Sequence, residues 1–118
     1  MSNQQLMAEL ASEYWKLLRA FERAATLAPE SARGRLTAQA RYSGGRLDSL
    51  IDKAGLRLAT FDGMMFEINM PAIAVNAEDV SASQALVVER TIEPTVISES
   101  TVILTGKVFL APASDKEG

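Results

Sequence analysis

The chain contains no cysteine and no histidine. Without cysteine there is no disulfide bond and no thiol nucleophile, and without either residue a zinc site of the usual kind cannot form. The absence of histidine also removes the side chain that most often serves as a general base. Most familiar catalytic groups are therefore missing, and we expect a protein that is not an enzyme and that uses no cofactor and no metal.

Long hydrophobic runs are missing as well. No apolar run approaches the ~20 residues that are needed to cross a bilayer, and the start, MSNQQLMAEL, has no basic stretch leading into an apolar one as a secretory signal has. We therefore expect a cytoplasmic protein with no membrane partner. The 118 residues are 47% hydrophobic and 23% charged, which is the balance of one folded globular domain.

Charge is unevenly distributed along the chain. Residues 1–55 hold eight Lys and Arg against six Asp and Glu, whereas residues 56–118 hold four against nine, and the net charge is −3. The arginines of the first half are interleaved with carboxylates, and aromatic residues make up only 6% of the chain. Nucleic-acid-binding surfaces usually combine clustered basic residues with aromatic ones, so we expect no nucleic-acid partner.

Apolar residues near the start of the chain recur in alternating steps of three and four, the heptad spacing of a coiled coil. These positions are Met7, Leu10, Tyr14, Leu17, Phe21, Ala24 and Ala28. Burying each large side chain is worth ~1.5–3 kcal/mol, so the seam must be covered either by the rest of the chain or by a second copy of it. The prediction is a homodimer contact, with an intramolecular bundle as the alternative, formed by Met7, Leu10, Tyr14, Leu17 and Phe21.

A second helix is predicted after Pro29, which separates it from the first because proline lacks an amide proton and disfavours helix for the preceding residue. Its periodic positions are Ala32, Leu36, Ala40, Ser43, Leu47, Leu50 and Ala54. Gly44 and Gly45 each cost ~1 kcal/mol relative to alanine inside a helix, so a break there is left open. Gly55 gives a stop signal. Residues 1–55 are thus predicted to be a helical dimerisation region, with the direction of pairing open.

After Gly55 the sequence consists of short β-branched runs separated by turn residues. The predicted strands cover residues 56–61, 64–68, 72–75, 85–92, 95–98 and 101–110. Asp62–Gly63 predicts a type I′ turn that joins the first two strands into a hairpin. Pro94 indicates an edge or turn, and Gly106 a bulge or a point of close packing.

The order of these segments defines the expected fold. Helices followed by strands predict an α+β protein, in which paired helices form a small bundle and precede a compact, wing-like all-β domain. The domain is expected over residues 56–113, and residues 114–118 are expected to be a flexible tail.

Several segments carry a resemblance to a known family. They are LLRAFERAATLA (17–28), LDSLIDKAGLRLATF (47–61), KAGLRLATFDGMMFE (53–67), AIAVNAEDV (72–80) and GKVFLA (106–111). Over about residues 10–113 this series resembles the core of the GrpE family, the nucleotide exchange factors of DnaK-type chaperones. The resemblance implies a dimer whose β domain binds the ATPase domain of the chaperone, favours its open form and so releases ADP. It implies no acid, base, metal or cofactor.

Signature motifs of that family are altered in this chain. The family's Phe-Asp-Pro turn corresponds to Phe66–Ile68, its His-Glu-Ala to Met70–Ala72, its Gly-Tyr to the surroundings of Pro94, and its closing Arg-Pro-Ala to Leu104–Gly106. The changes favour a second hypothesis, in which a dimer with an acidic β head acts as an adaptor or structural protein and binds another partner without exchange. An enzyme is the remaining alternative, and its candidate carboxylates are Asp62, Glu67, Glu78 and Asp79.

The partner-binding surface is expected in the β domain. Met64 and Met65 would place flexible, polarizable side chains beside the turn, which suits an adaptable contact surface, although strand alternation would turn one of them inward. Contact positions implied by the resemblance lie near Phe66, Thr91, Ser100 and Leu110. The complete candidate set is Met64, Met65, Phe66, Met70, Thr91, Ser100 and Leu110.

Overall fold

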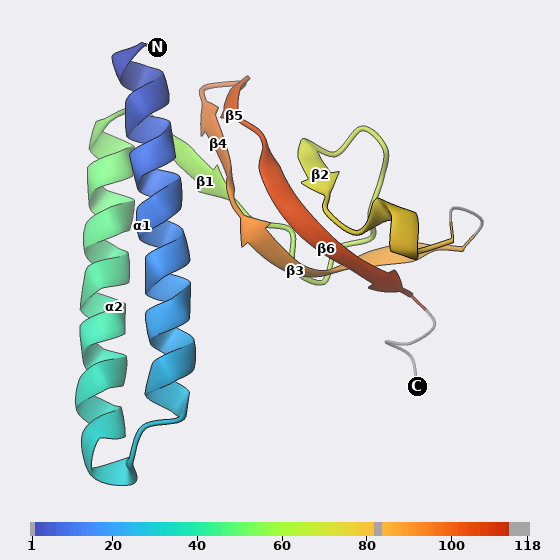
Figure 1. Cartoon of the computed structure of the whole chain (residues 1–118). Helices are drawn as coiled ribbons and strands as arrows, with labels where there is room; N and C mark the ends of the chain where they lie inside the picture. The colour runs from blue at the N-terminus through green and yellow to red at the C-terminus, as the bar shows by residue number, and fades with distance from the viewer. Residues whose placement is uncertain (1, 82–83, 114–118) are drawn as a thin grey trace.

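The computed structural model describes residues 2–81 and 84–113. Two antiparallel helices, α1 (Asn3–Thr26) and α2 (Glu30–Lys53), form a hairpin that precedes a β region (Figure 1). The predicted α+β fold with an N-terminal helical pair is confirmed. Hairpin and β region lie side by side in a flat molecule with Cα extents of 44 × 42 × 19 Å. Each helix therefore keeps a face that no other element covers.

The helix ends follow local signals in the sequence. Ser2 caps α1, since its hydroxyl oxygen accepts a hydrogen bond from the Gln5 N–H at 3.1 Å. Pro29 precedes α2, and the helix then continues through Gly44 and Gly45 without a break. Gly55 has a φ of +74°, a conformation that glycine adopts without strain, and it ends α2 as predicted.

Four strands form one long, bent hairpin. β3 (Leu86–Glu93) leads past Pro94 into β4 (Thr95–Ser98), and β5 (Thr101–Leu104) leads into β6 (Gly106–Pro112). β4 pairs with β5, and β3 pairs with β6, both antiparallel. The hairpin changes from one sheet to the other at Pro94, because proline has no N–H to donate to a ladder.

Two short strands complete the two sheets. β1 (Arg57–Ala59) pairs antiparallel with β4, and β2 (Ala72–Ala74) pairs parallel with β6, which gives the orders β1-β4-β5 and β2-β6-β3. Past the end of β2, the Asn76 side chain takes over the pairing with β6. Its Nδ2 donates to the Leu110 carbonyl and its Oδ1 accepts from the Leu110 N–H, both at 2.9 Å. A short 3-10 turn, η1 (Ala77–Asp79), follows.

The predicted hairpin across Asp62–Gly63 is wrong, and the segment after it forms no regular strand. β1 pairs with β4 instead, while the following segment lies along β3 with a single bridge at Met65. Gly63 has a φ of +82°, whereas Asp62 is not among the residues with positive φ, and the Met64 N–H donates to the Phe61 carbonyl at 3.0 Å. This pattern is that of a type II turn rather than type I′.

Two apolar cores hold the structure together. The junction core, which joins the hairpin to the sheet β1-β4-β5, has as its buried members Ala8, Ala11, Leu47, Ile51, Leu56 and Val96. The β core packs against the sheet β2-β6-β3. Its buried members are Phe61, Val88, Val108 and Leu110. The small β region thus depends on the hairpin for one of its two cores.

Most of the heptad seam of α1 lies outside these cores, although the half-buried Tyr14 packs against the junction core. The buried residues of α1 are Ala8, Ala11, Ser12 and Ala25. Short side chains on this face allow α2 and the sheet to approach closely. Met7, Leu10 and Leu17 point away from both cores and are exposed. The alternative of an intramolecular bundle over this part of the seam is therefore wrong.

Gly106 lies where the long hairpin is most tightly packed. Its N–H donates to the Thr95 Oγ1 at 2.9 Å, and that hydroxyl donates in turn to the Pro71 carbonyl at 2.5 Å. A Cβ atom on Gly106 would lie 2.5 Å from the Glu93 carbonyl oxygen and 2.7 Å from the Thr95 nitrogen. The close-packing point that the sequence indicated is confirmed.

Replacement of Gly106 by alanine is expected to lower the free energy of unfolding by about 1–3 kcal/mol, because backbone atoms must shift to admit the methyl group. Urea denaturation followed by circular dichroism measures this change. Gly45→Ala is the matched control, since a Cβ at Gly45 meets nothing within 4 Å. This control should gain about 0.5–1 kcal/mol, as expected for alanine in place of glycine inside a helix. Equal effects of the two substitutions would contradict the close packing.

Candidate functional site

The main candidate site is the α1 face, defined here as Met7, Leu10, Tyr14, Leu17 and Phe21. Leu10 is 71% exposed and Leu17 is 74% exposed, while Met7 is 45% exposed. Tyr14 and Phe21 are half-buried. The spacing that predicted a seam therefore produces an apolar surface that stays open to solvent within one chain. A stripe of this kind at helical spacing is typical of a helix that packs against a partner helix.

A groove between the helices runs along this face and has a volume of about 530 Å³. Its lining residues include Leu10, Tyr14, Leu17, Leu18 and Phe21 of α1, with Gln39 and Ser43 of α2. The Tyr14 hydroxyl donates a hydrogen bond to the Ser43 carbonyl at 3.0 Å. The aromatic ring of Tyr14 lines the groove. The groove is thus mostly apolar, and α2 contributes residues that the seam alone does not reveal.

The predicted partner-binding residues do not form one surface. Met64 and Met65 are each 50% exposed, so neither is turned inward, because the segment is not a regular strand. Ser100 is also exposed, but it lies in the turn between β4 and β5. That turn is near the start of α1, where the Gln4 Nε2 donates to the Ser98 Oγ at 2.9 Å. Met65 lies beside the start of β3, whereas Ser100 follows the end of β4, so Ser100 and the two methionines are far apart along these two strands.

Four members of that predicted set are buried or half-buried. Thr91 is 5% exposed and Leu110 is 2% exposed, so neither side chain presents a surface to a partner in this structure. Thr91 holds a turn, and Leu110 is a member of the β core. Phe66 and Met70 are half-buried and pack against the same core. Met64 and Met65 remain as the exposed apolar members of the set.

Other exposed apolar residues of the β region were missed by sequence reasoning. Ile68 is fully exposed, Ile73 is 56% exposed and Val75 is 50% exposed. A strand predicted over residues 64–68 gave no reason to treat Ile68 differently from Met64 or Phe66. Ile73 is the central residue of β2 and faces away from the β core, on the side opposite to Ala72 and Ala74.

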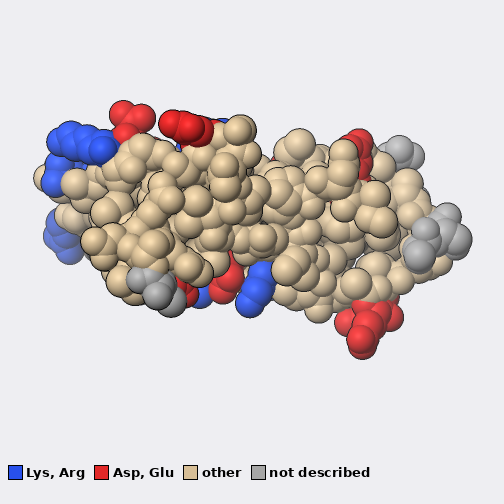
Figure 2. Space-filling view, turned by 90° about the horizontal axis from the view of Figure 1, so that it is seen from above, with Lys and Arg blue, Asp and Glu red and all other residues tan. Residues whose placement is uncertain are grey.

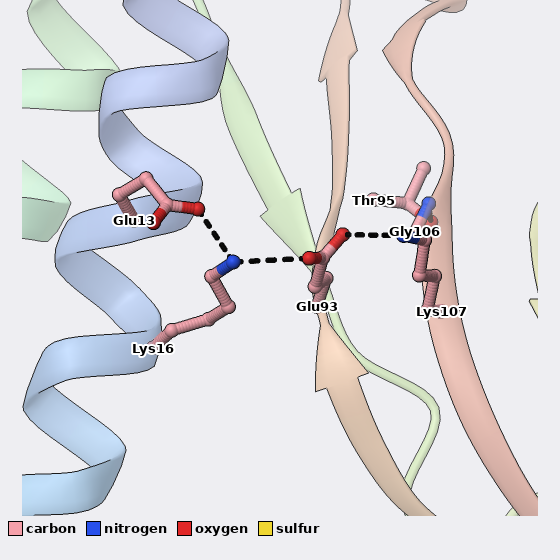
Figure 3. A network of polar contacts seen from close by, with 6 residues as sticks. All are labelled: Glu13, Lys16, Glu93, Thr95, Gly106 and Lys107. Carbon is pink, nitrogen blue, oxygen red and sulfur yellow. Dashed lines mark hydrogen bonds and ion pairs between the residues drawn. The ribbon is translucent and has the colours of Figure 1, made fainter. Parts of the chain in front are cut away.

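Ion pairs connect the hairpin to the β region (Figure 3). Lys16 Nζ lies 2.5 Å from the Glu13 carboxylate and 3.0 Å from that of Glu93, and Glu93 also lies 3.8 Å from Lys107 Nζ. The hydrogen bond with Glu13, and then that with Glu93, raises the pKa of Lys16 above its ordinary value. The contribution of this raised pKa to the stability of the folded state is fully present below the ordinary pKa of lysine. It is lost only as the pH rises through the raised pKa of Lys16. The link between α1 and β3 is therefore intact at neutral pH.

Asp62 makes a second connection between the same elements. Its Oδ1 accepts from the Thr91 N–H at 2.8 Å, and its Oδ2 lies 3.4 Å from the Arg19 guanidinium. The Thr91 hydroxyl oxygen in turn accepts from the Phe61 N–H at 2.9 Å. Asp62, one of the four carboxylates considered for catalysis, therefore has a structural role. It accepts the hydrogen bond of the buried Thr91 N–H.

Asp62→Ala is expected to lower the free energy of unfolding by about 1–3 kcal/mol, the usual cost of leaving a buried N–H without an acceptor. The group affected is the N–H of Thr91. Asp62→Asn is the matched control, because its amide oxygen still accepts that hydrogen bond. Urea denaturation should place the asparagine variant between the wild type and the alanine variant. Identical losses in both variants would show that the hydrogen bond to Thr91 contributes nothing.

The remaining carboxylate candidates, Glu67, Glu78 and Asp79, are all exposed. Within residues 2–81 and 84–113, no group of three or more acidic residues is placed so that it could hold a metal ion. In the view of Figure 2, Lys and Arg lie mainly on the helical side, where Asp and Glu lie beside them, whereas the far end of the β region shows Asp and Glu. The charge asymmetry of the sequence is thus visible on this face as an acidic end of the β region.

Comparison with known proteins finds no match to a family model, to a curated protein or to a solved structure. In the part of the chain that the structure describes, neither helix combines the length and apolar character needed to span a membrane. The fold and the α1 face therefore define the class of protein as an α+β chain with an exposed apolar helical surface.

Proposed function

We propose that the protein is a non-enzymatic binding protein that works as a homodimer through the α1 face. The observation that carries this proposal is the exposure of Leu10 and Leu17, at 71% and 74%, on a heptad stripe of a well-capped helix. A second copy presents the same stripe and the same groove, and a two-fold interface would place the exposed leucines of each copy against the groove of the other. A pair of hairpins would then form the small bundle that one chain lacks.

The energetic balance allows this pairing. Full burial of an exposed large apolar side chain contributes ~1.5–3 kcal/mol. Leu10 and Leu17 of each chain would gain most of this, whereas Met7, Tyr14 and Phe21, which are already partly buried, would gain only part of it. Association costs an estimated 4–15 kcal/mol in lost freedom of motion, so the gain from two chains is of the same order as that cost. Glu13 also lines the groove, and its carboxylate is paired there with Lys16.

Replacement of both Leu10 and Leu17 by glutamate is expected to convert a dimer into a monomer, because two charges per chain would enter the interface. Sedimentation equilibrium or light scattering measures the mass. Both leucines are largely exposed in one chain, so circular dichroism should show that the monomer stays folded. Ile68→Glu, a fully exposed position in the β region, should remain dimeric. A wild-type chain that stays monomeric at high concentration would refute the proposal.

For the β region, the proposed activity is that of a GrpE-like exchange factor in the cytoplasm. The helical pair followed by two small sheets agrees with the resemblance found in the sequence, and Met64 and Met65 offer exposed contacts. The mechanism would be differential binding to the open form of a DnaK-type ATPase domain. A preference of ~1.4 kcal/mol for that form changes the equilibrium tenfold. No group of this chain would make or break a bond.

The activity is tested by release of fluorescent ADP from the ATPase domain of a DnaK-type chaperone. The wild-type chain is expected to accelerate release by about tenfold or more, and Met64→Glu/Met65→Glu should lose most of this effect, because charge would enter an apolar contact. The matched control is Leu27→Glu, an 87% exposed leucine at the far end of α1. A dimeric wild type that leaves ADP release unchanged would reject exchange.

The adaptor hypothesis is the second candidate, and specific observations favour it. The altered signature motifs, together with the burial of Thr91 and Leu110, remove contacts that the resemblance implies for an exchange factor. In that case the β region binds a different protein partner through its exposed apolar residues and acidic end. The release assay separates the two candidates, because only exchange changes the rate.

A further inference from the structure

A basic cleft lies where α1 meets β3, away from the α1 face. It has a volume of about 260 Å³, and its lining residues are Trp15, Lys16, Arg19, Arg23, Arg90, Thr91 and Ile92. Every ionisable group in this lining is a cation. This is unusual in a chain whose net charge is −3, and it requires a physical explanation.

The fold brings these cations together from two elements. Lys16, Arg19 and Arg23 are spaced three and four residues apart, so they share one face of α1. Arg90 approaches from β3 on the opposite wall. The arginine heads are held by aromatic rings: Arg19 lies 4.8 Å above the Trp15 ring, and Arg90 lies 5.6 Å above the Phe109 ring. Such stacking restricts a guanidinium without using its hydrogen-bond donors.

The charges of the cleft are only partly compensated. Lys16 is paired with Glu13 and Glu93, and Arg19 lies 3.4 Å from Asp62. Among residues 2–81 and 84–113, no carboxylate forms an ion pair with Arg23 or Arg90. Like charges on adjacent turns of a helix repel each other, so Arg23 beside Arg19 is a cost to the isolated chain. An anion between α1 and β3 would remove that cost.

We propose that this cleft binds a small molecule that carries a diphosphate or longer phosphate group, with Arg23 and Arg90 gripping it from opposite walls. Guanidinium groups match phosphate oxygens with pairs of parallel hydrogen bonds, and such charge-assisted bonds are the strong ones. Several cations around one cleft suit a ligand with several negative charges. The bound phosphate group would connect α1 to β3 beside the Lys16–Glu93 ion pair. This site is separate from the surfaces of the proposed dimer and of the proposed exchange activity.

Trp15 provides a direct signal, since it is the one tryptophan of the chain and lines the cleft. Pyrophosphate is titrated into the full chain at constant ionic strength while tryptophan fluorescence is recorded. A saturable change is expected in the wild type, and the double variant Arg23→Gln/Arg90→Gln should bind about tenfold more weakly, because two charge-assisted contacts are lost. Both side chains are exposed, so circular dichroism should show an unchanged fold.

Arg35→Gln/Arg46→Gln is the matched control, because it removes the same charge from exposed positions of α2 that do not line the cleft. This control should bind pyrophosphate as the wild type does. Equal weakening in both double variants would overturn the proposal, since it would show attraction to overall charge only. The proposal also fails if pyrophosphate causes no saturable change, or if only an aspartate-rich peptide does so, which would indicate a protein partner.

Discussion

The contact between Gly106 and the backbone of Glu93 and Thr95 is the constraint on which the rest of the structure depends. It holds the two arms of the long hairpin together where β3 gives way to β4 and β5 to β6. On one side of this point the strands pack on the helices, and on the other side they form the β core. The same point presents the Glu93 carboxylate to Lys16 (Figure 3). Gly106 thus allows the close approach of the two β arms at the point where Pro94 ends one sheet and where Glu93 meets α1.

Local signals made the helices predictable, and long-range pairing made the strands less so. Pro29, Gly55 and the heptad spacing act within a few residues, and both helices formed where they were expected. The hairpin predicted across Asp62–Gly63 does not form, because β1 pairs with β4, which is distant in sequence. The same limit applies to the site: the pattern located the α1 face, but only the fold shows that Thr91 and Leu110 are inside.

The spacing of apolar residues also does not reveal whether an apolar helix face is buried within the chain or against a partner. In α1 the leucines Leu10 and Leu17 lie on the solvent side, whereas alanines together with the half-buried Tyr14 and Trp15 make the internal contacts. The two exposed leucines add little to the stability of an isolated chain, because large apolar groups stabilise a fold only when they leave water. The proposal of a second copy on this face follows from that imbalance. The two faces of α1 would then have separate tasks, one in folding and one in assembly, while the basic cleft uses a third side of the same helix.

The side chain of Asn76 has a further consequence for how this protein meets others. It occupies both the N–H and the carbonyl of Leu110 on the flank of β6 that lies past β2. An extended peptide from another molecule therefore finds no free backbone groups there with which to lengthen the sheet. Open sheet flanks are common starting points for aggregation. The Asn76 amide thus blocks the addition of a strand at Leu110 on this flank of β6.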